Sequence, residues 1–159
     1  MIQKITPYLW FDNQAEEAAH FYTSIFNNSK VGDIQRYGEG GPGEPGSAMI
    51  VTFELEGQQF VALNGGPQYK FSEAISFFVS CETQKEVDHF WQKLNSAGGE
   101  EGPCGWLKDR YGVSWQIIPT ALTELMSDPN PEKAGKVMQA MLQMSKIDIA
   151  GLRRAYEQA

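Results

Sequence analysis

Two stretches decide the fold: HFYTSIF at residues 20–26 and HFWQKLN at residues 89–95, which hold the only two histidines of the 159-residue chain. The stretches lie 69 residues apart, and at this offset residues 5–27 align with residues 74–96 without a gap. A similar succession of apolar and polar segments surrounds each of them. The sequence therefore predicts two copies of one structural unit.

Each copy begins with a strand that is followed by a helix. The runs ITPYLWF at 5–11 and AISFFVS at 74–80 are short and rich in β-branched and aromatic residues, which is typical of strands. A polar break follows, in which Asp12, Asn13 and Thr83 are candidate helix caps. About fourteen residues with apolar positions at helical spacing come next and predict an amphipathic helix in each copy.

The histidines mark the edge of the apolar stripe on each predicted helix. The stripes consist of Ala18, Phe21, Tyr22, Ile25 and Phe26 in the first copy and of Val87, Phe90, Trp91 and Leu94 in the second. His20 and His89 lie at or beyond the edge of these stripes. We therefore expect solvated histidines at the rim of each helix rather than metal ligands or general bases.

Extended segments bounded by turn residues follow each predicted helix. They are residues 31–38, 48–55 and 58–64 in the first copy, and a segment near 102–108 with residues 113–119 in the second. Glu56-Gly57 and DRYG at 109–112 predict tight turns. The Gly/Pro-rich connector at 38–46 predicts a mobile loop that could act as a lid.

Each half of the chain thus reads β-α-β-β-β, which predicts an α+β fold. We expect two tandem βαβββ modules that form a curved mixed sheet around a cleft, with C-terminal helices. The expected organisation is a single domain over residues 1–159, with a first module at 1–68, a second at 69–120 and a helical tail at 121–159. A chain of this length buries roughly 68–70% of its unfolded surface, which is enough for a core.

The tail has its own helix signals. Asn130 and Pro131 are a cap and a first-turn proline, and Asp148 is a candidate cap for a last short helix that contains Leu152 and Tyr156. An apolar stripe between them consists of Val137, Met138, Met141, Leu142 and Met144. We expect this stripe either to cover the sheet or to meet a second subunit.

Composition excludes several classes of partner. A net charge of −7 argues against nucleic acid and against anionic membrane surfaces, because both need clustered Lys and Arg. No segment approaches the roughly 20 apolar residues of a membrane span, and residues 1–11 lack the features of a signal sequence. Cys81 and Cys104 could form one disulfide, but we expect reduced thiols in a cytoplasmic protein.

Three motifs carry a resemblance to a known family. They are the pattern P-Y-L-x-F with E-E-A-x-x-F-Y-x-x-x-F over residues 7–26, the run CGWLKDRYGVSWQIIP at 104–119, and the tail pattern at 137–152. With the paired modules, they make the chain similar to the vicinal oxygen chelate superfamily, which includes glyoxalases, bleomycin resistance proteins and extradiol dioxygenases. More narrowly, the chain resembles the PhnB-like branch, often labelled demethylubiquinone methyltransferase.

The resemblance implies a cleft in which His and Glu side chains hold a divalent ion. The implied ligand positions fall on Pro7 (or Thr6 with a one-residue slip), on Ser76 (or Ile75), on Gln116, and within residues 60–64, where Asn64 is the only donor. Proline offers no ligand atom, and serine and glutamine are weak neutral donors. An oxygen-only set without a carboxylate would also bind Mg or Ca poorly. We therefore expect no metal and no cofactor.

The methyltransferase label implies a site for S-adenosylmethionine. Such a site on a doubly wound sheet needs a glycine-rich turn between the first strand and its helix. Here that junction reads WFDNQAEE over residues 10–17, without glycine. The glycine-rich segment at 38–46 joins two strands instead and contains prolines. The sequence gives no physical basis for this cofactor.

The cleft predicted in its place is apolar and aromatic. Strand alternation and the family spacing assign six residues to its lining: Leu9, Asn64, Ser76, Phe78, Ser114 and Gln116. Trp106, which flanks the most specific motif, is a seventh candidate as a stacking surface. Trp115 is an alternative stacking surface, while Asp109 and Arg110 are expected to build the turn. Cys104 is not expected to be a nucleophile, because the sequence does not place a base beside it. Such a lining suits small, uncharged organic molecules.

Three functions remain open on the sequence. The first is a metal-free protein that binds a small apolar or aromatic molecule. The second is an enzyme, either of isomerase or lyase type or the methyltransferase that the family label implies. The third is an interaction protein whose dimer surface matters more than its cleft. We favour the binding protein, and the resemblance implies that it assembles as a homodimer.

Overall fold

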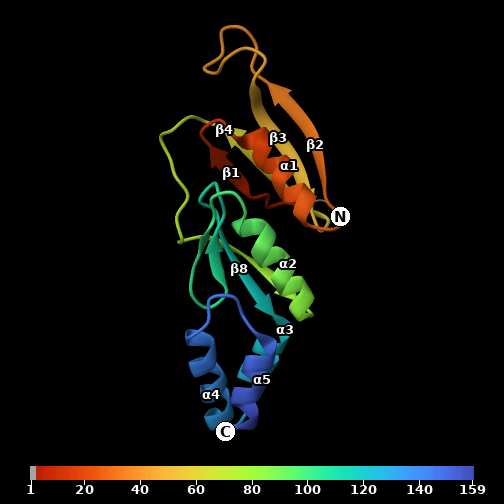
Figure 1. The fold of residues 1–159 in the computed structure, drawn as a ribbon. Coiled ribbons are helices and arrows are strands. Elements are labelled where there is room, and N and C mark those ends of the chain that lie inside the picture. The colour runs from red at the N-terminus through yellow and green to blue at the C-terminus, as the bar shows by residue number, and fades with distance from the viewer. Residues whose placement is uncertain (1–2) are drawn as a thin grey trace. The chain divides into compact units, whose positions relative to one another are not determined.

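A computed structural model describes residues 3–159 of the chain. The chain forms two compact units, one that ends at Phe71 and one from Ser72 to Ala159 (Figure 1). This division lies three residues beyond the predicted boundary between the modules. The single domain over 1–159 stays a prediction.

The first unit is a four-stranded mixed sheet with one helix. Its elements are β1 (Tyr8–Phe11), α1 (Ala15–Ile25), β2 (Lys30–Arg36), β3 (Ala48–Leu55) and β4 (Gln58–Asn64). The strand order is β1-β4-β3-β2, with β1 parallel to β4 and the other neighbours antiparallel. The predicted strands at 48–55 and 58–64 are confirmed to the residue. The predicted Glu56-Gly57 turn between them is also confirmed, with positive φ at both residues.

The second unit repeats this topology and adds a helical tail. Its sheet and helix consist of β5 (Ser76–Cys81), α2 (Gln84–Asn95), β6 (Glu100–Glu101), β7 (Trp106–Lys108) and β8 (Ser114–Pro119). The strand order β5-β8-β7-β6 matches that of the first unit, again with the outer pair parallel. The predicted α+β fold with two βαβββ modules is confirmed, and each module has its own four-stranded sheet.

Each helix covers one face of its sheet, as Figure 1 shows. In the first unit the ring of Tyr22 on α1 stacks on Phe53 of β3, with centroids 6.0 Å apart. In the second unit α2 buries Val87 and Leu94 completely. The predicted apolar stripes are therefore confirmed. His20 and His89 are exposed on the helices, as the phase of the stripes predicted.

The gap-free alignment of the two copies is wrong by one residue in the first strands. Leu9 is opposite Ala62, which is in turn opposite Val51, and this row lies on the sheet face that α1 covers. In β5 the corresponding core position is Val79, which is opposite Ile117. The strands thus repeat at an offset of 70 and the helices at 69. The cause is the junction between strand and helix, which has three residues at 12–14 but two at 82–83.

The helix caps follow the sequence only in part. Thr83 caps α2 as predicted, accepting a hydrogen bond from the backbone N–H of Glu86 at 3.2 Å. At α1 neither predicted residue is the cap, because Gln14 occupies that position. The first backbone N–H of α1, that of Ala15, donates instead to Oδ1 of Asn64 at 2.8 Å.

The tail forms three helices: α3 (Thr120–Met126), α4 (Pro131–Leu142) and α5 (Ile149–Glu157). Asn130 caps α4 as predicted, whereas Asp148 precedes α5 without a side-chain cap bond. These helices share a small core that consists of Ile118, Leu122, Val137, Ile147 and Leu152. Over residues 3–159, no helix combines the length and apolar character that crossing a membrane requires.

The β7–β8 turn depends on one buried carboxylate. Asp109 is 3% exposed, and its oxygens accept hydrogen bonds from the backbone N–H groups of Tyr111 (2.8 Å) and Val113 (3.1 Å) and from Nε1 of Trp115 (2.9 Å). The predicted role of Asp109 in the turn is confirmed. The bond to Trp115 also ties the turn to the core.

Asp109→Ala should lower the free energy of unfolding by about 3 kcal/mol, because three buried donors lose their acceptor. Urea denaturation followed by tryptophan fluorescence would measure the loss. The exposed Asp12 serves as a control, and Asp12→Ala should cost about 0.5 kcal/mol or less. Equal losses in the two variants would show that the carboxylate does not hold the turn.

Candidate functional site

Three predicted residues lie side by side across the second sheet. Gln116 on β8 is directly opposite Phe78 on β5 and Trp106 on β7. Directly opposed residues project from the same face of a sheet. The residues that alternate with them, Phe77, Trp115 and Leu107, project toward α2, so the row of Phe78, Gln116 and Trp106 lies on the face away from α2.

This face forms one side of a cavity of about 480 Å³. The cavity is lined by Phe78, Cys104, Trp106, Gln116 and Ile118 from the sheet and its turn, and by Leu122, Thr123, Met126, Ser127 and Met141 from α3 and α4. Its volume lies within the range of small-molecule sites, and its lining is mostly apolar with a few hydrogen-bonding groups. No carboxylate, imidazole or ammonium group belongs to that lining.

Gln116 is the main polar group at the base of the cavity. Its Nε2 donates a hydrogen bond to Oγ of Ser76 at 2.9 Å, which fixes the direction of the amide. The structure gives its carbonyl oxygen no partner among residues 3–159. A ligand that carries an O–H or N–H group can therefore donate to this oxygen.

Ser114 lies on the same face as Gln116, beside a second hollow. This hollow, of about 390 Å³, shares Trp106 with the first cavity and has Glu73 and Lys108 at its edge. Lys108 forms an ion pair with Glu73, which lowers the pKa of Glu73 and raises that of Lys108. Oγ of Ser114 is buried without a hydrogen-bond partner in the described part of the chain.

The two site residues predicted in the first unit, Leu9 and Asn64, contact the protein's own core and backbone. Leu9 is 7% exposed and lies on the face that α1 covers, because the first strand is one residue out of the expected phase. Tyr8 and Trp10 occupy the opposite face instead. Asn64 uses both ends of its amide internally, since Oδ1 accepts from Ala15 N and Nδ2 donates to Ala48 O at 3.0 Å.

The connector predicted as a lid borders a hollow of about 730 Å³ in the first unit. Tyr37 anchors its start, because the ring hydroxyl donates to the carbonyl oxygen of Asn64 at 2.8 Å. Arg36 forms an ion pair with Glu16 at 3.2 Å. Arg36 and Glu16 thus pair with each other within the hollow, which Asp12 and Glu44 also line, and a lid movement stays a prediction.

The family's ligand positions do not fit a metal ion. At the offset of 70, the residue of the first copy that is equivalent to Ser76 is Thr6. Thr6, the alternative given by a one-residue slip, therefore replaces Pro7 as the implied ligand position. Register likewise makes Val61 the counterpart of Gln116, since Val61 is opposite Tyr8 as Gln116 is opposite Phe78. This set contains no imidazole, thiolate or carboxylate. Across residues 3–159, no three His, Cys, Asp or Glu side chains form a group that could hold an ion.

The two cysteines are both free thiols. Burial, with a further effect of the nearby Glu86 carboxylate, raises the pKa of Cys81 to about 12, so this thiol stays protonated at neutral pH. Cys104 is half-buried at the edge of the cavity, in a turn where its φ is 59°. The cavity lining contains no His, Asp or Glu side chain that could act as its base.

Sequence reasoning missed the half of the cavity that comes from the tail. The only signal was the methionine stripe, for which covering the sheet was one of two expectations. Met141 does lie over the sheet face, as a lining residue of the cavity. Met138 and Leu142 of the same stripe are exposed. The other tail residues of the cavity lining, Leu122, Thr123, Met126 and Ser127, had no local sequence pattern to identify them. These four residues and Met141 are called the wall below.

Two βαβββ modules with identical strand order are the arrangement that the resemblance to the vicinal oxygen chelate superfamily implies. The sequence model of the 3-demethylubiquinone-9 3-methyltransferase family matches residues 3–118, and the chain belongs to this family. Comparison with curated proteins gives no match.

Solved structures agree with this assignment. The PhnB protein from Bacillus cereus is 40% identical, with a TM-score of 0.67 over 74% of this chain and 99% of its own. Protein PA1353 from Pseudomonas aeruginosa is 19% identical, with a TM-score of 0.61 over 74% of this chain and 98% of its own. The fosfomycin resistance protein FosX from Listeria monocytogenes is 14% identical, with a TM-score of 0.51 over 75% and 94%. The last two similarities show the fold alone.

The match ends before the tail. The family model stops at residue 118, although the sequence suggested that the resemblance continues through 137–152. The wall that α3 and α4 supply therefore lies outside the matched region.

The donor set predicts that the purified protein carries no stoichiometric metal. Elemental analysis of protein expressed in medium with added Zn, Ni, Mn and Fe should find each metal well below one ion per chain. Gln116→Glu with Ser76→His is a useful contrast, since it introduces two strong ligands on neighbouring strands and should raise metal retention. One tightly held ion per chain in the unmodified protein would contradict the prediction.

Proposed function

We propose that the chain is a metal-free binding protein for a small apolar or aromatic molecule, held in the cavity of the second unit. The observation that carries the proposal is the row of Phe78, Gln116 and Trp106. It places a hydrogen-bond acceptor between two aromatic side chains on one sheet face. An aromatic ring with a hydroxyl group is the simplest ligand that uses all three.

An isomerase or lyase would need an acid or a base in contact with its substrate. The cavity lining contains no carboxylate, imidazole or ammonium group that could serve as either. This absence from the lining favours binding over catalysis.

The family name describes methyl transfer to a demethylated ubiquinone. A hydroquinone ring with its hydroxyl groups belongs to the ligand class proposed for the cavity. S-adenosylmethionine does not fit, since the strand-to-helix junctions at 12–14 and 82–83 contain no glycine to approach a cofactor. We therefore favour a quinol-like ligand that is bound without methyl transfer.

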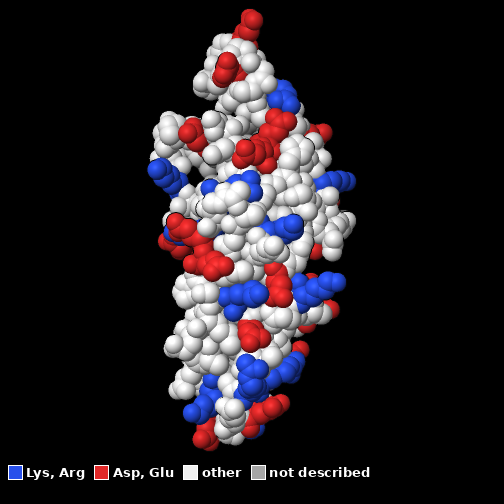
Figure 2. Space-filling model, viewed as in Figure 1, with Lys and Arg blue, Asp and Glu red and all other residues white. Residues whose placement is uncertain are grey.

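The charge distribution supports a small ligand rather than nucleic acid. Figure 2 shows acidic and basic side chains interspersed over the visible face. A nucleic-acid site would need a continuous basic surface. A cytoplasmic location is proposed with this function, on the basis of the two free thiols.

A panel of phenols, quinols and naphthols should shift the tryptophan fluorescence or melting temperature of the protein. Phe78→Ala should raise about 10-fold the dissociation constant of any compound of the panel that binds, since it removes a stacking surface. Tyr69→Ala is a matched control, because Tyr69 is an exposed aromatic residue outside the cavity lining. Phe78 and Tyr69 are 55% and 67% exposed, so neither change should unfold the chain. A broad panel without any shift would refute the binding proposal.

We also propose a homodimer. Large apolar side chains stay exposed at Ile5, Ile75, Met138 and Leu142, and the first two occupy equivalent positions in the two modules at the offset of 70. Light scattering after gel filtration should give twice the chain mass of 17.8 kDa. A monomer mass at micromolar concentration would contradict this assembly.

A further inference from the structure

Half of the proposed binding cavity comes from a part of the chain that the family match does not include. Met126 on α3 and Met141 on α4 face the sheet residues across the cavity, with Leu122, Thr123 and Ser127 beside them. The PhnB protein of Bacillus cereus aligns over almost its whole length yet leaves a quarter of this chain unmatched. The residues of α3 and α4 that line the cavity therefore lie outside the region that the family model matches.

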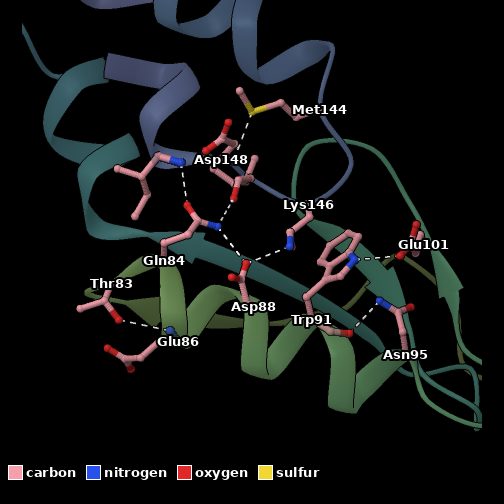
Figure 3. Close-up of polar contacts among 12 residues, drawn as sticks. Thr83, Gln84, Glu86, Asp88, Trp91, Asn95, Glu101, Met144, Lys146 and Asp148 are labelled. Carbon is pink, nitrogen blue, oxygen red and sulfur yellow. Dashed lines mark hydrogen bonds and ion pairs between the residues drawn. The ribbon is translucent and has the colours of Figure 1, made fainter. Parts of the chain in front are cut away.

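The connection between α4 and α5 is fixed to α2 chiefly by the side chain of Gln84. Nε2 of Gln84 donates to the carbonyl oxygen of Ile147 at 3.0 Å, and its Oε1 accepts from the backbone N–H of Ile149 at 2.8 Å. Both ends of one amide therefore bind the tail. Figure 3 shows Gln84 at the centre of this network, with Asp88 and Lys146 forming an ion pair at 2.9 Å next to it.

The same connection is also fixed to the turn before β7. The backbone N–H groups of Cys104 and Gly105 donate to the carbonyl oxygens of Met144 and Ser145, both at 2.8 Å. Gly105 permits this approach. Its φ is +83°, and an added Cβ would lie 2.9 Å from the carbonyl oxygen of Ile117 and 3.1 Å from Cγ1 of Ile147.

The helices that carry the two methionines are joined to this anchor by their own core. Ile118 of β8 packs with Leu122 of α3, Val137 of α4 and Ile147. The hydroxyl of Tyr156 donates to Oδ2 of Asp128 at 2.6 Å and so links α5 to the segment that follows α3. The tail is therefore a fixed wall of the cavity rather than a mobile cover.

We propose that this wall determines which ligand the protein accepts, and that Met126 and Met141 are its specificity-determining residues for flat, uncharged ring compounds. The inference rests on the proposed function and adds a size limit to it. Thioether sulfurs make favourable contacts with aromatic rings and adapt to their shape. With Phe78 and Trp106 across the cavity, they form a slot in which a planar ring fits between two apolar walls.

The test is a size series that consists of phenol, 2-naphthol and 9-phenanthrol, with affinity measured by fluorescence titration or calorimetry. The unmodified protein should bind 2-naphthol best and 9-phenanthrol at least 10-fold more weakly. The double variant Met126→Ala/Met141→Ala should reverse this order, because it widens the slot. Met141→Phe should act in the opposite direction and favour phenol. Met138→Ala is the control, since Met138 is a 44% exposed methionine of the same helix outside the cavity lining.

Gly105→Ala gives an independent measurement, because it loosens the wall without changing a lining residue. It should also relax the preference for 2-naphthol over 9-phenanthrol, and it keeps the proposal open to refutation if the double variant does not fold. Binding by the unmodified protein with an unchanged order in folded variants would overturn the wall's role while leaving the proposed function intact. Failure of the unmodified protein to bind any of the three compounds would overturn both.

Discussion

The hydrogen bonds of the Asp109 carboxylate hold the register on which the proposed site depends. They link the tip of the β7–β8 turn to the ring nitrogen of Trp115, which is buried beneath α2. With Trp115 held on that side, Gln116 must project from the other. A slip of one residue would exchange the two faces, and the cavity would lose its polar group to the core. A turn residue thus decides the chemistry of a site several residues away.

Much of the fold follows from local pattern. Helical stripes, strand runs and the Glu56-Gly57 turn predicted both modules, and the repeat predicted that they share one topology. The phase of the first strand did not follow, because Tyr8, Leu9, Trp10 and Phe11 are all apolar and alternation cannot distinguish the face beneath α1 from the other. The length of the strand-to-helix junction decides that phase, and the apolar pattern does not encode it.

The proposed site was predictable only where strand alternation applies. Gln116 and Phe78 were placed on one face because polar and apolar residues alternate along 113–117 and the family spacing sets the phase, whereas Trp106 was named because it flanks the most specific motif. Asn64 shows the opposite case: an amide at a strand end can serve a ligand or the fold, and its partner Ala15 lies 49 positions away. The wall from α3 and α4 depends on backbone carbonyl groups and on Gln84, contacts that leave no local sequence signal.

The unequal junctions at 12–14 and 82–83 have a consequence for how the two modules diverged. If the modules arose from one ancestral unit, substitutions alone cannot have produced both, since one residue was gained or lost between strand and helix. In each module, the strand and the helix that flank the junction still direct their apolar residues toward the core. The gained or lost residue therefore lies entirely in the junction between them. These junctions are therefore the positions where the repeat tolerates changes of length, while its packed elements tolerate only changes of side chain.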